Sequence, residues 1–173
     1  MFQASGAAYD RDMAFTVRVA EPRDLPLLPA IESSADGLFG PLGISFPPGP
    51  TVIEEVDADT SEILVLGDPP VGFAAVITQD GHPHLEQIAL HSSHTGRGLG
   101  GPLLKEVVQR ADGELTLITF RDVPWNGPWY ARHGFTEFPQ ERWGPELRAR
   151  WQAEIDAGLH ALGPRLIMHR PER

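Results

Sequence analysis

The feature that most constrains the fold is a glycine-rich segment, Thr95 to Gly101, which separates two apolar patterns of different period. The residues before it, ending at Leu90, follow a pattern typical of a strand. From Leu99 to Ala111, apolar residues recur at every third or fourth position. The change of period predicts a strand, a turn and an amphipathic helix in that order.

A turn of this kind is able to bind an anion through its main chain. Glycines let consecutive N–H groups point the same way and let a ligand approach the backbone. The first turn of a helix adds unpaired N–H groups and a partial positive charge. The segment therefore predicts a site for phosphate or pyrophosphate, to which Arg97 adds a charge, or else only a tight turn between strand and helix.

Two common nucleotide-binding motifs do not fit this segment. A P-loop requires Gly-Lys followed by Ser or Thr, and no such triplet follows here. A dinucleotide-binding fold places its glycine turn after an early strand, with an acidic residue about 20 positions further on. Here the turn comes mid-chain, after two strands that residues 79–81 predict to form an antiparallel hairpin.

The composition narrows the class of protein. The 173 residues suit one domain, and the absence of cysteine excludes disulfides, cysteine zinc sites and cysteine nucleophiles. No apolar run approaches the roughly 20 residues of a membrane span, and no secretory signal opens the chain, so we expect a cytoplasmic protein with no membrane partner. The net charge of -10 argues against nucleic acid as a partner; it suits a cationic substrate or serves only solubility.

The turn residues and apolar periods predict an α/β protein with a single domain at 14–173, preceded by a disordered tail at 1–13. Strands are predicted at 15–19, 62–66, 71–78, 84–90, 115–120, 134–138 and 166–169. Helices are predicted at 25–37, 51–57, 99–111 and 125–132, whereas 41–50 is too rich in proline and glycine for regular structure. A helical insertion is expected near 141–164, with one apolar face made by Leu147, Trp151, Ile155 and Leu159.

Two segments resemble those of a known family. Ile88–His91 followed by Thr95–Gly100 resembles the acetyl-CoA signature of the GNAT N-acetyltransferase superfamily, Arg/Gln-x-x-Gly-x-Gly/Ala, which follows the fourth strand. Asn126–Phe135 is similar to that family's segment with a Tyr four residues before Gly-Phe. The resemblance runs from Phe15 to Phe138.

The resemblance implies a GNAT fold, which is a mixed, mostly antiparallel sheet flanked by helices. It also implies an enzyme that transfers an acetyl group from acetyl-CoA to a primary amine by direct attack in a ternary complex. The acceptor would be an amine-bearing small molecule or protein, and a homodimer is one option. The alternatives are a non-catalytic acyl-CoA-binding or regulatory module of the same fold and a transferase for a longer acyl-CoA. No metal is expected, because His91 and His94 have no third ligand close in sequence.

The resemblance places the catalytic acid at Tyr130, whose phenol can protonate the departing thiolate. Packing beside Trp129 is the alternative role of this tyrosine. The base is expected on the strand at 84–90, where His84 and Glu86 share one face. Glu86 is the candidate base, acting directly or through a water, and His84 is its rival; Glu86 is otherwise an ordinary exposed strand carboxylate.

The resemblance also implies how the cofactor is held. The pantetheine arm would pair with backbone groups of Ile88 and Leu90 like an added strand, and an N–H near Leu90 would meet the oxyanion. Thr95 stands where the family has Arg or Gln, so the pyrophosphate is expected to be bound mostly by main chain. Asn126 would bond the arm or serve as a helix N-cap. The predicted cofactor-binding residues are Ile88, Ala89, Leu90, Thr95, Gly96, Arg97, Gly98, Leu99, Gly100, Gly101, Asn126 and Tyr130.

The acceptor site is the least determined part. In the family the loop between the first two helices helps to build it, which corresponds here to Phe39–Pro50 with Phe46 as an apolar wall. Glu32 and Asp36 are interpreted either as anchors for a cationic acceptor or as solvated helix faces. The helical insertion would cap the acceptor end of the site, line a dimer interface or extend the core.

Overall fold

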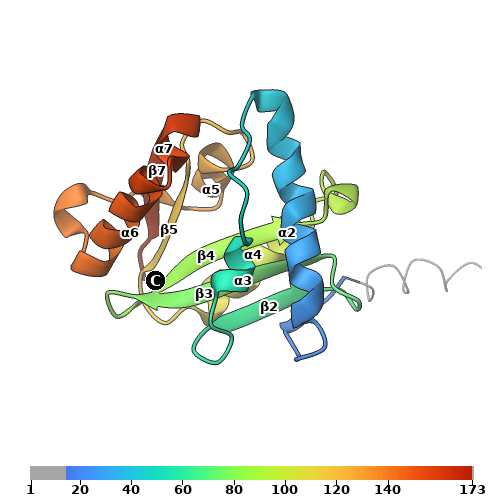
Figure 1. Cartoon of the computed structure of the whole chain (residues 1–173). Helices are drawn as coiled ribbons and strands as arrows, with labels where there is room; N and C mark the ends of the chain where they lie inside the picture. Colours follow the sequence, from blue (N-terminus) through green and yellow to red (C-terminus); the bar gives the residue numbers. More distant parts are fainter. Residues whose placement is uncertain (1–14, 173) are drawn as a thin grey trace, which may run out of the picture. The chain divides into compact units, whose positions relative to one another are not determined.

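The computed structural model describes residues 15–172, so the tail predicted at 1–13 lies outside the described residues. Within the described range the strands form one seven-stranded sheet in the order β1-β2-β3-β4-β5-β7-β6 (Figure 1). The strands are β1 (Val17–Val19), β2 (Glu62–Leu66), β3 (Gly72–Gln79), β4 (His82–Leu90), β5 (Leu115–Phe120), β6 (Thr136–Glu137) and β7 (Arg165–Arg170).

The sheet is mixed. β1 pairs with β2, β5 with β7, and β6 with β7 in antiparallel fashion, whereas β4 and β5 run parallel to each other. The crossover between the two parallel strands contains the amphipathic helix that follows the glycine-rich segment. The predicted fold class, a mostly antiparallel sheet flanked by helices, is therefore confirmed.

The helices follow the predicted order. The α-helices are α2 (Leu28–Asp36), α3 (Val52–Glu55), α4 (Gly100–Arg110), α5 (Gly127–Arg132), α6 (Pro145–Asp156) and α7 (Leu159–Leu162). The 3-10 helices are η1 (Leu25–Leu27), η2 (Gly37–Leu42), η3 (Ser92–His94) and η4 (Gln140–Arg142). The prediction of no regular structure at 41–50 is wrong only at its start, where η2 accommodates Pro41.

The chain divides into two compact units. The first unit comprises residues up to Leu38 together with Pro50–Ala75 and Gln87–Gln109. The second unit comprises Phe39–Gly49, Val76–Glu86 and the residues from Arg110 onward. β3 and β4 each run from one unit into the other, so the first unit contains the end of β4 and the glycine-rich segment.

The core of the first unit explains why α2 forms where the sequence predicts a helix. Leu28 and Ile31, three positions apart on one helix face, are buried in one cluster with Val65 of β2 and Phe73 of β3. Ile53 of α3 joins the same cluster. α2 thereby covers β2 and β3 within this unit.

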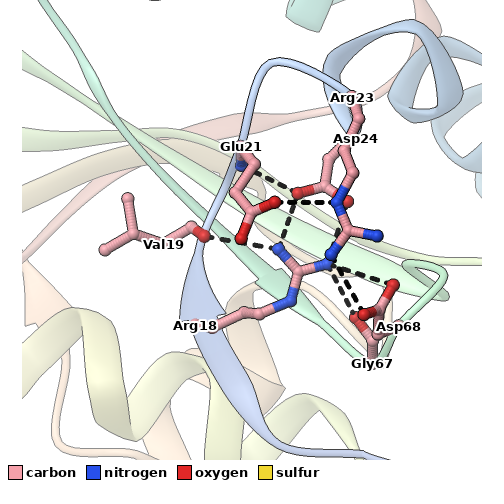
Figure 2. Close-up of polar contacts among 7 residues, drawn as sticks. All are labelled: Arg18, Val19, Glu21, Arg23, Asp24, Gly67 and Asp68. Carbon is pink, nitrogen blue, oxygen red and sulfur yellow. Dashed lines mark hydrogen bonds and ion pairs between the residues drawn. The ribbon is translucent and has the colours of Figure 1, made fainter.

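A polar cluster fixes the chain between β1 and α2 (Figure 2). Arg18 donates to both carboxylate oxygens of Asp24, at 2.6 and 2.9 Å, and Asp24 is 1% exposed. Asp24 also accepts from the Glu21 main-chain N–H at 2.8 Å. The hydrogen bond from Arg18 lowers the pKa of Asp24 to about 2. Arg23 extends the cluster to Asp68, in the turn after β2, at 3.1 Å.

In the second unit, α6 is attached to the β3–β4 turn. The Asp80 carboxylate accepts from the N–H groups of Glu146 and Leu147, at 2.9 and 3.0 Å, so it caps the helix from outside. The Glu146 carboxylate in turn accepts from the Asp80 N–H. Gly144 is required here, because a Cβ at this position would lie 2.2 Å from the Asp80 side chain.

The expectation of an amphipathic helix in the insertion near 141–164, with four apolar residues on one face, is only partly right. The segment contains two helices, because Gly158 adopts a φ of 82° between α6 and α7. Leu147 is buried, but Ile155 is 42% exposed and does not belong to the buried face. Trp143 and Trp151 pack on each other with ring centroids 5.2 Å apart.

None of the helices in the described part of the chain is long and apolar enough to cross a membrane.

Candidate functional site

The glycine-rich segment of the first unit adopts the backbone that its composition predicts. Gly96 and Gly98 both have a φ of 74°, a conformation that side chains with a Cβ rarely adopt. A Cβ placed on either glycine would have nothing within 4 Å. Thr95 closes η3, because its hydroxyl donates to the Ser92 carbonyl at 2.9 Å. The main chain from Thr95 to Gly98 is therefore exposed beside open space.

α4 places its N-terminus at the end of this segment. Leu103, Leu104 and Val107 are buried, so this face of the helix is covered. The helix begins at Gly100, so the N–H groups of Gly100 and Gly101 fall in the first turn, where intrahelical acceptors are lacking. These groups and the helix dipole favour an anion at this position.

At the end of β4, the main-chain N–H groups of two residues point away from β3. The His91 N–H donates to the Val71 carbonyl at 2.8 Å, so it faces β3. Because N–H directions alternate along a strand, the N–H groups of Ile88 and Leu90 face the opposite side. The Ile88 N–H is bonded to the Gln87 side-chain oxygen at 3.0 Å instead of to a strand.

The pairing of β4 with β5 covers only the beginning of β4. It joins His84 to Thr116 and Leu85 to Leu117, both in the second unit. The sequence analysis did not single out Gln87, the residue whose side chain bonds Ile88 further along β4. No sequence signal marks it, because a glutamine on a strand is ordinary.

Glu32 has a different role from the two that the sequence suggested. Its side chain is 2% exposed, so the interpretation as a solvated helix face is wrong. Its two oxygens accept from the N–H groups of Val52 and Ile53 at 2.7 and 2.9 Å, and one also accepts from Gln87 at 3.1 Å. Glu32 thus holds the first turn of α3, and these bonds occupy both of its oxygens.

Asp36, one turn further along α2, is half-buried. Burial, and after it the negative charge of Glu32, raise the pKa of Asp36 to about 6. This carboxyl group therefore changes charge close to neutral pH.

Tyr130 lies on α5 in the second unit and is 6% exposed. Its ring contacts Trp129 and Phe135, with centroids 5.1 and 5.6 Å away. Burial raises the pKa of the phenol above its ordinary value, although the charge of Arg165 opposes the shift. Tyr130 therefore stays protonated at neutral pH, as a proton donor must.

Asn126 occupies the N-cap position of α5, but its side chain does not cap the helix. The side-chain amide donates to the Trp125 carbonyl at 3.2 Å instead. The following residue, Gly127, approaches β5 so closely that a Cβ would lie 2.4 Å from the Arg121 carbonyl oxygen. α5 is therefore held tightly against the end of β5.

Glu86, in the half of β4 that belongs to the second unit, is paired with a cation. Arg150 of α6 donates from Nη1 to Glu86 Oε1 at 2.5 Å and from Nε to the Gln79 side chain at 2.7 Å. The Glu86 side chain is 14% exposed, so it is not the ordinary exposed strand carboxylate of the alternative interpretation. The sequence analysis missed Arg150, which lies 64 positions from Glu86.

His84 is the other residue considered as a base. It is 1% exposed, and its Nδ1 lies 2.8 Å from the Thr116 hydroxyl. Burial, and after it the charge of Arg150, lower the pKa of His84 to about 3. The ring is therefore neutral at pH 7, and at 1% exposure it is not accessible to an acceptor amine. Its Nε2 lies 3.7 Å from Glu86 Oε2, beyond ordinary hydrogen-bond distance.

Phe46 lies in an aromatic cluster of the second unit. Its ring is 5.2 Å from Phe39 and 6.2 Å from Phe120 of β5. Trp125 packs on Phe39 at 5.3 Å and is 39% exposed. Phe46 therefore packs in an apolar cluster of this unit, and its role as a wall of the acceptor site stays a prediction.

Among residues 15–172 there is no group of three or more side chains placed to hold a metal ion. His91 and His94 instead both contact the Ser93 hydroxyl, at 2.7 and 2.9 Å.

Comparison with known proteins shows which proteins this chain resembles. A family model described as an acetyltransferase (GNAT) domain matches residues 59–137. An uncharacterized N-acetyltransferase, YjcF of Bacillus subtilis (strain 168), is 30% identical over 90 residues, which are 51% of this chain. The match spans 64% of that relative, which is less than two thirds of its length.

Solved structures share the fold at low identity. The ribosomal-protein-S18-alanine N-acetyltransferase of Escherichia coli matches with a TM-score of 0.64 and 20% identity, over 91% of this chain and 93% of its own. A GNAT acetyltransferase of Staphylococcus aureus Mu50 matches with a TM-score of 0.66 and 14% identity, over 92% and 100%. The N-acetylglutamate synthase of Neisseria gonorrhoeae, complexed with coenzyme A and L-arginine, matches with a TM-score of 0.61 and 18% identity, over 91% of this chain and 33% of its own.

The family model spans the end of β4, the glycine-rich segment and α4, which are the elements that carry the signature in the sequence. The shared fold extends over most of the remaining chain. The chain therefore resembles GNAT acetyltransferases in sequence over residues 59–137, and it shares the fold of the solved structures over most of its length.

Proposed function

We propose that the protein transfers an acetyl group from acetyl-CoA to a primary amine. One observation carries the proposal: two glycines with positive φ follow η3 and lead into the N-terminus of α4, within the segment that matches the family model. This backbone suits the pyrophosphate of a coenzyme. A structural neighbour, the synthase of Neisseria gonorrhoeae, was solved with coenzyme A bound, which supports the choice of ligand.

The first unit would bind the cofactor through its main chain. We propose that the N–H groups from Arg97 to Gly101 bind the pyrophosphate, without the basic or amide side chain that the family has at the position of Thr95. The pantetheine arm would pair with Ile88 and Leu90, whose N–H groups face away from β3. For Ile88 this pairing would replace the Gln87 side chain. The Leu90 N–H would then stabilise the oxyanion.

Glu86 would act as the base. An amine that is charged in solution has to lose a proton before it can attack the thioester carbonyl carbon. We propose that the Glu86 carboxylate takes this proton, directly or through a water. The carbon–sulfur bond then breaks, the acetyl group stays on the nitrogen, and no covalent enzyme intermediate forms.

Tyr130 would act on the leaving group. Its phenol would donate a hydrogen bond and finally a proton to the thiolate sulfur, which has a pKa near that of cysteine, about 8.5. The raised pKa of Tyr130 keeps the donor protonated at neutral pH. The side chain of Asn126 would bond the pantetheine arm.

Further expectations from the sequence remain proposals. We propose a cytoplasmic protein that acts as one N-acetyltransferase domain, uses no metal and does not bind nucleic acid. Assembly as a homodimer is one option within this proposal.

A thiol-release assay tests the proposed function. The wild-type protein is mixed with acetyl-CoA and a panel of primary amines, and free CoA is followed with a thiol reagent. The expected result is amine-dependent release that the Tyr130→Phe variant loses and the Tyr9→Phe variant keeps, since Tyr9 is the other tyrosine of the chain. Tight binding of CoA without turnover on any amine would favour a non-catalytic binding module. Faster release from propionyl- or succinyl-CoA would favour a longer acyl donor.

A further inference from the structure

The ion pair between Glu86 and Arg150 joins the candidate base to an arginine whose bonds are shared between two residues. Arg150 has five N–H donors, of which Nε bonds Gln79 and Nη1 bonds Glu86. Its Nη2 takes part in neither of these two bonds. About a third of the Arg150 side chain, 32%, is exposed.

Arg165 shows what a purely structural arginine looks like in the same unit. Its Nε and Nη2 both bond the Glu154 carboxylate, at 2.9 and 2.7 Å, and its side chain is only 11% exposed. This bidentate pair ties α6 to β7. Asp80 already holds the other end of α6, so the helix is attached at both ends without Arg150.

The charges around Glu86 also matter. Glu86 and Arg150 carry one charge of each sign, and His84 adds none because burial keeps its ring neutral. An acceptor whose only charged group is an ammonium would be attracted weakly, because Arg150 already compensates the charge of the Glu86 carboxylate. An acceptor with both an ammonium group and a carboxylate could pair the ammonium with Glu86 and the carboxylate with Arg150. Guanidinium is also the side chain best shaped for a carboxylate.

We infer that the acceptor is an amine that also bears a carboxylate, as a free amino acid does, and that Arg150 is the residue that binds this carboxylate. The inference rests on the proposed function and names its substrate class. The carboxylate would hold the acceptor by accepting a hydrogen bond from Nη2 of Arg150. The ammonium group would then lie at Glu86, where it loses its proton before attack.

The experiment compares acceptors that differ only in the carboxylate. Alanine is paired with ethylamine and alaninamide, and phenylalanine with phenethylamine, with acetyl-CoA held at saturation. We expect kcat/KM for at least one amino acid to exceed that of its decarboxylated partner by about tenfold or more. This ratio corresponds to one charge-assisted hydrogen bond.

The Arg150→Met variant should lose this preference, with a KM for the amino acid raised about tenfold or more and an unchanged KM for acetyl-CoA. Arg150→Lys should recover part of the preference, because the charge returns without the planar fork. Arg148→Met is the matched control on the same helix, since Arg148 bonds the carbonyl groups of Gln140 and Trp143 and lies over the Trp143 ring. It should keep the wild-type preference.

The possible failures are distinguishable. Equal acetylation of amines with and without the carboxylate, or an unchanged preference in Arg150→Met, overturns the inference and leaves the proposed function intact. If no amine of the panel is acetylated, the proposed function fails. In that case, saturation-transfer NMR measures whether the same amino acids bind to the wild-type protein, and this binding tests the inference. Binding that Arg150→Met loses and Arg148→Met keeps supports it, and absence of binding to the wild type overturns it.

Discussion

Replacing Gly98 by alanine tests whether the main chain of the glycine-rich segment binds the cofactor. Gly98 has a φ of 74°, and a Cβ built there would have no neighbour within 4 Å. The fold would therefore not clash with the new methyl group. The substitution should therefore have two effects. It should strain the backbone, and it should weaken the binding of a ligand that occupies the open space.

The effect of the strain on stability can be estimated, and a second glycine provides a control for it. A residue with a Cβ in the left-handed region costs about 1 kcal/mol, which lowers the Tm of a chain of this size by about 2–4 °C. Gly81, in the β3–β4 turn, has a φ of 77° and equally open surroundings, so Gly81→Ala should lower the Tm by the same amount. The difference between the two variants isolates the contribution of the ligand.

In Gly98→Ala the methyl group would displace the pyrophosphate from at least one N–H donor. A hydrogen bond to a charged group contributes about 1.5–3 kcal/mol, so the KM for acetyl-CoA should rise about tenfold or more. Thermal unfolding and steady-state kinetics measure the two effects separately. Thr95→Ala should leave this KM nearly unchanged, since its hydroxyl bonds the Ser92 carbonyl. Equal KM values in Gly98→Ala and Gly81→Ala would refute the assignment of the segment to the pyrophosphate.

Three other substitutions have definite expected outcomes. Tyr130→Phe should lower kcat about 100-fold, with little change in the KM for acetyl-CoA, in a single-turnover and steady-state comparison. Asp24→Asn should lower the free energy of unfolding by about 1–2 kcal/mol at pH 7, measured by urea titration. Arg18 holds the pKa of Asp24 at about 2, below its ordinary 3.8. The difference in stability between the variant and the wild type should therefore persist above pH 4 and vanish as the pH falls through 2. Asp36→Asn should act in the opposite sense. The folded state raises the pKa of Asp36 to about 6, so ionisation weakens folding as the pH rises from 4 to 6. The variant should therefore match the wild type at pH 4 and exceed its stability at pH 8, and equal stability at both pH values would contradict the role of burial.

Much of the fold was predictable because the signals are local. β2 and β5 begin and end at the predicted residues, since each is an apolar run bounded by turn residues. The helix after the glycine-rich segment also follows from its period alone. The insertion was predicted less well, because nothing in the sequence indicates that Gly158 would adopt a positive φ and end α6.

The roles of charged side chains were not predictable, because their partners are remote in the chain. Glu32 is an unremarkable acidic residue on a helix until α3 folds back and places two N–H groups against it, 20 and 21 positions away. Arg150 becomes relevant only when α6 lies where it reaches Glu86 and Gln79. In contrast, the glycine-rich segment was predictable, because its conformation depends on adjacent residues.

These pairings between residues remote in the chain also change the acceptor that the net charge favours. A charge of -10 agrees with attraction of a cation, and the sequence alone allows that interpretation. In the folded chain, however, Asp24 accepts from Arg18, Glu32 from the start of α3, and Glu86 from Arg150. These carboxylates stabilise the fold or share their charge with a neighbouring guanidinium, so the excess of acidic residues is not an excess of cation-binding groups at Glu86. A carboxylate that is already paired favours an acceptor that brings a negative charge of its own, and the comparison of alanine with ethylamine measures that preference directly.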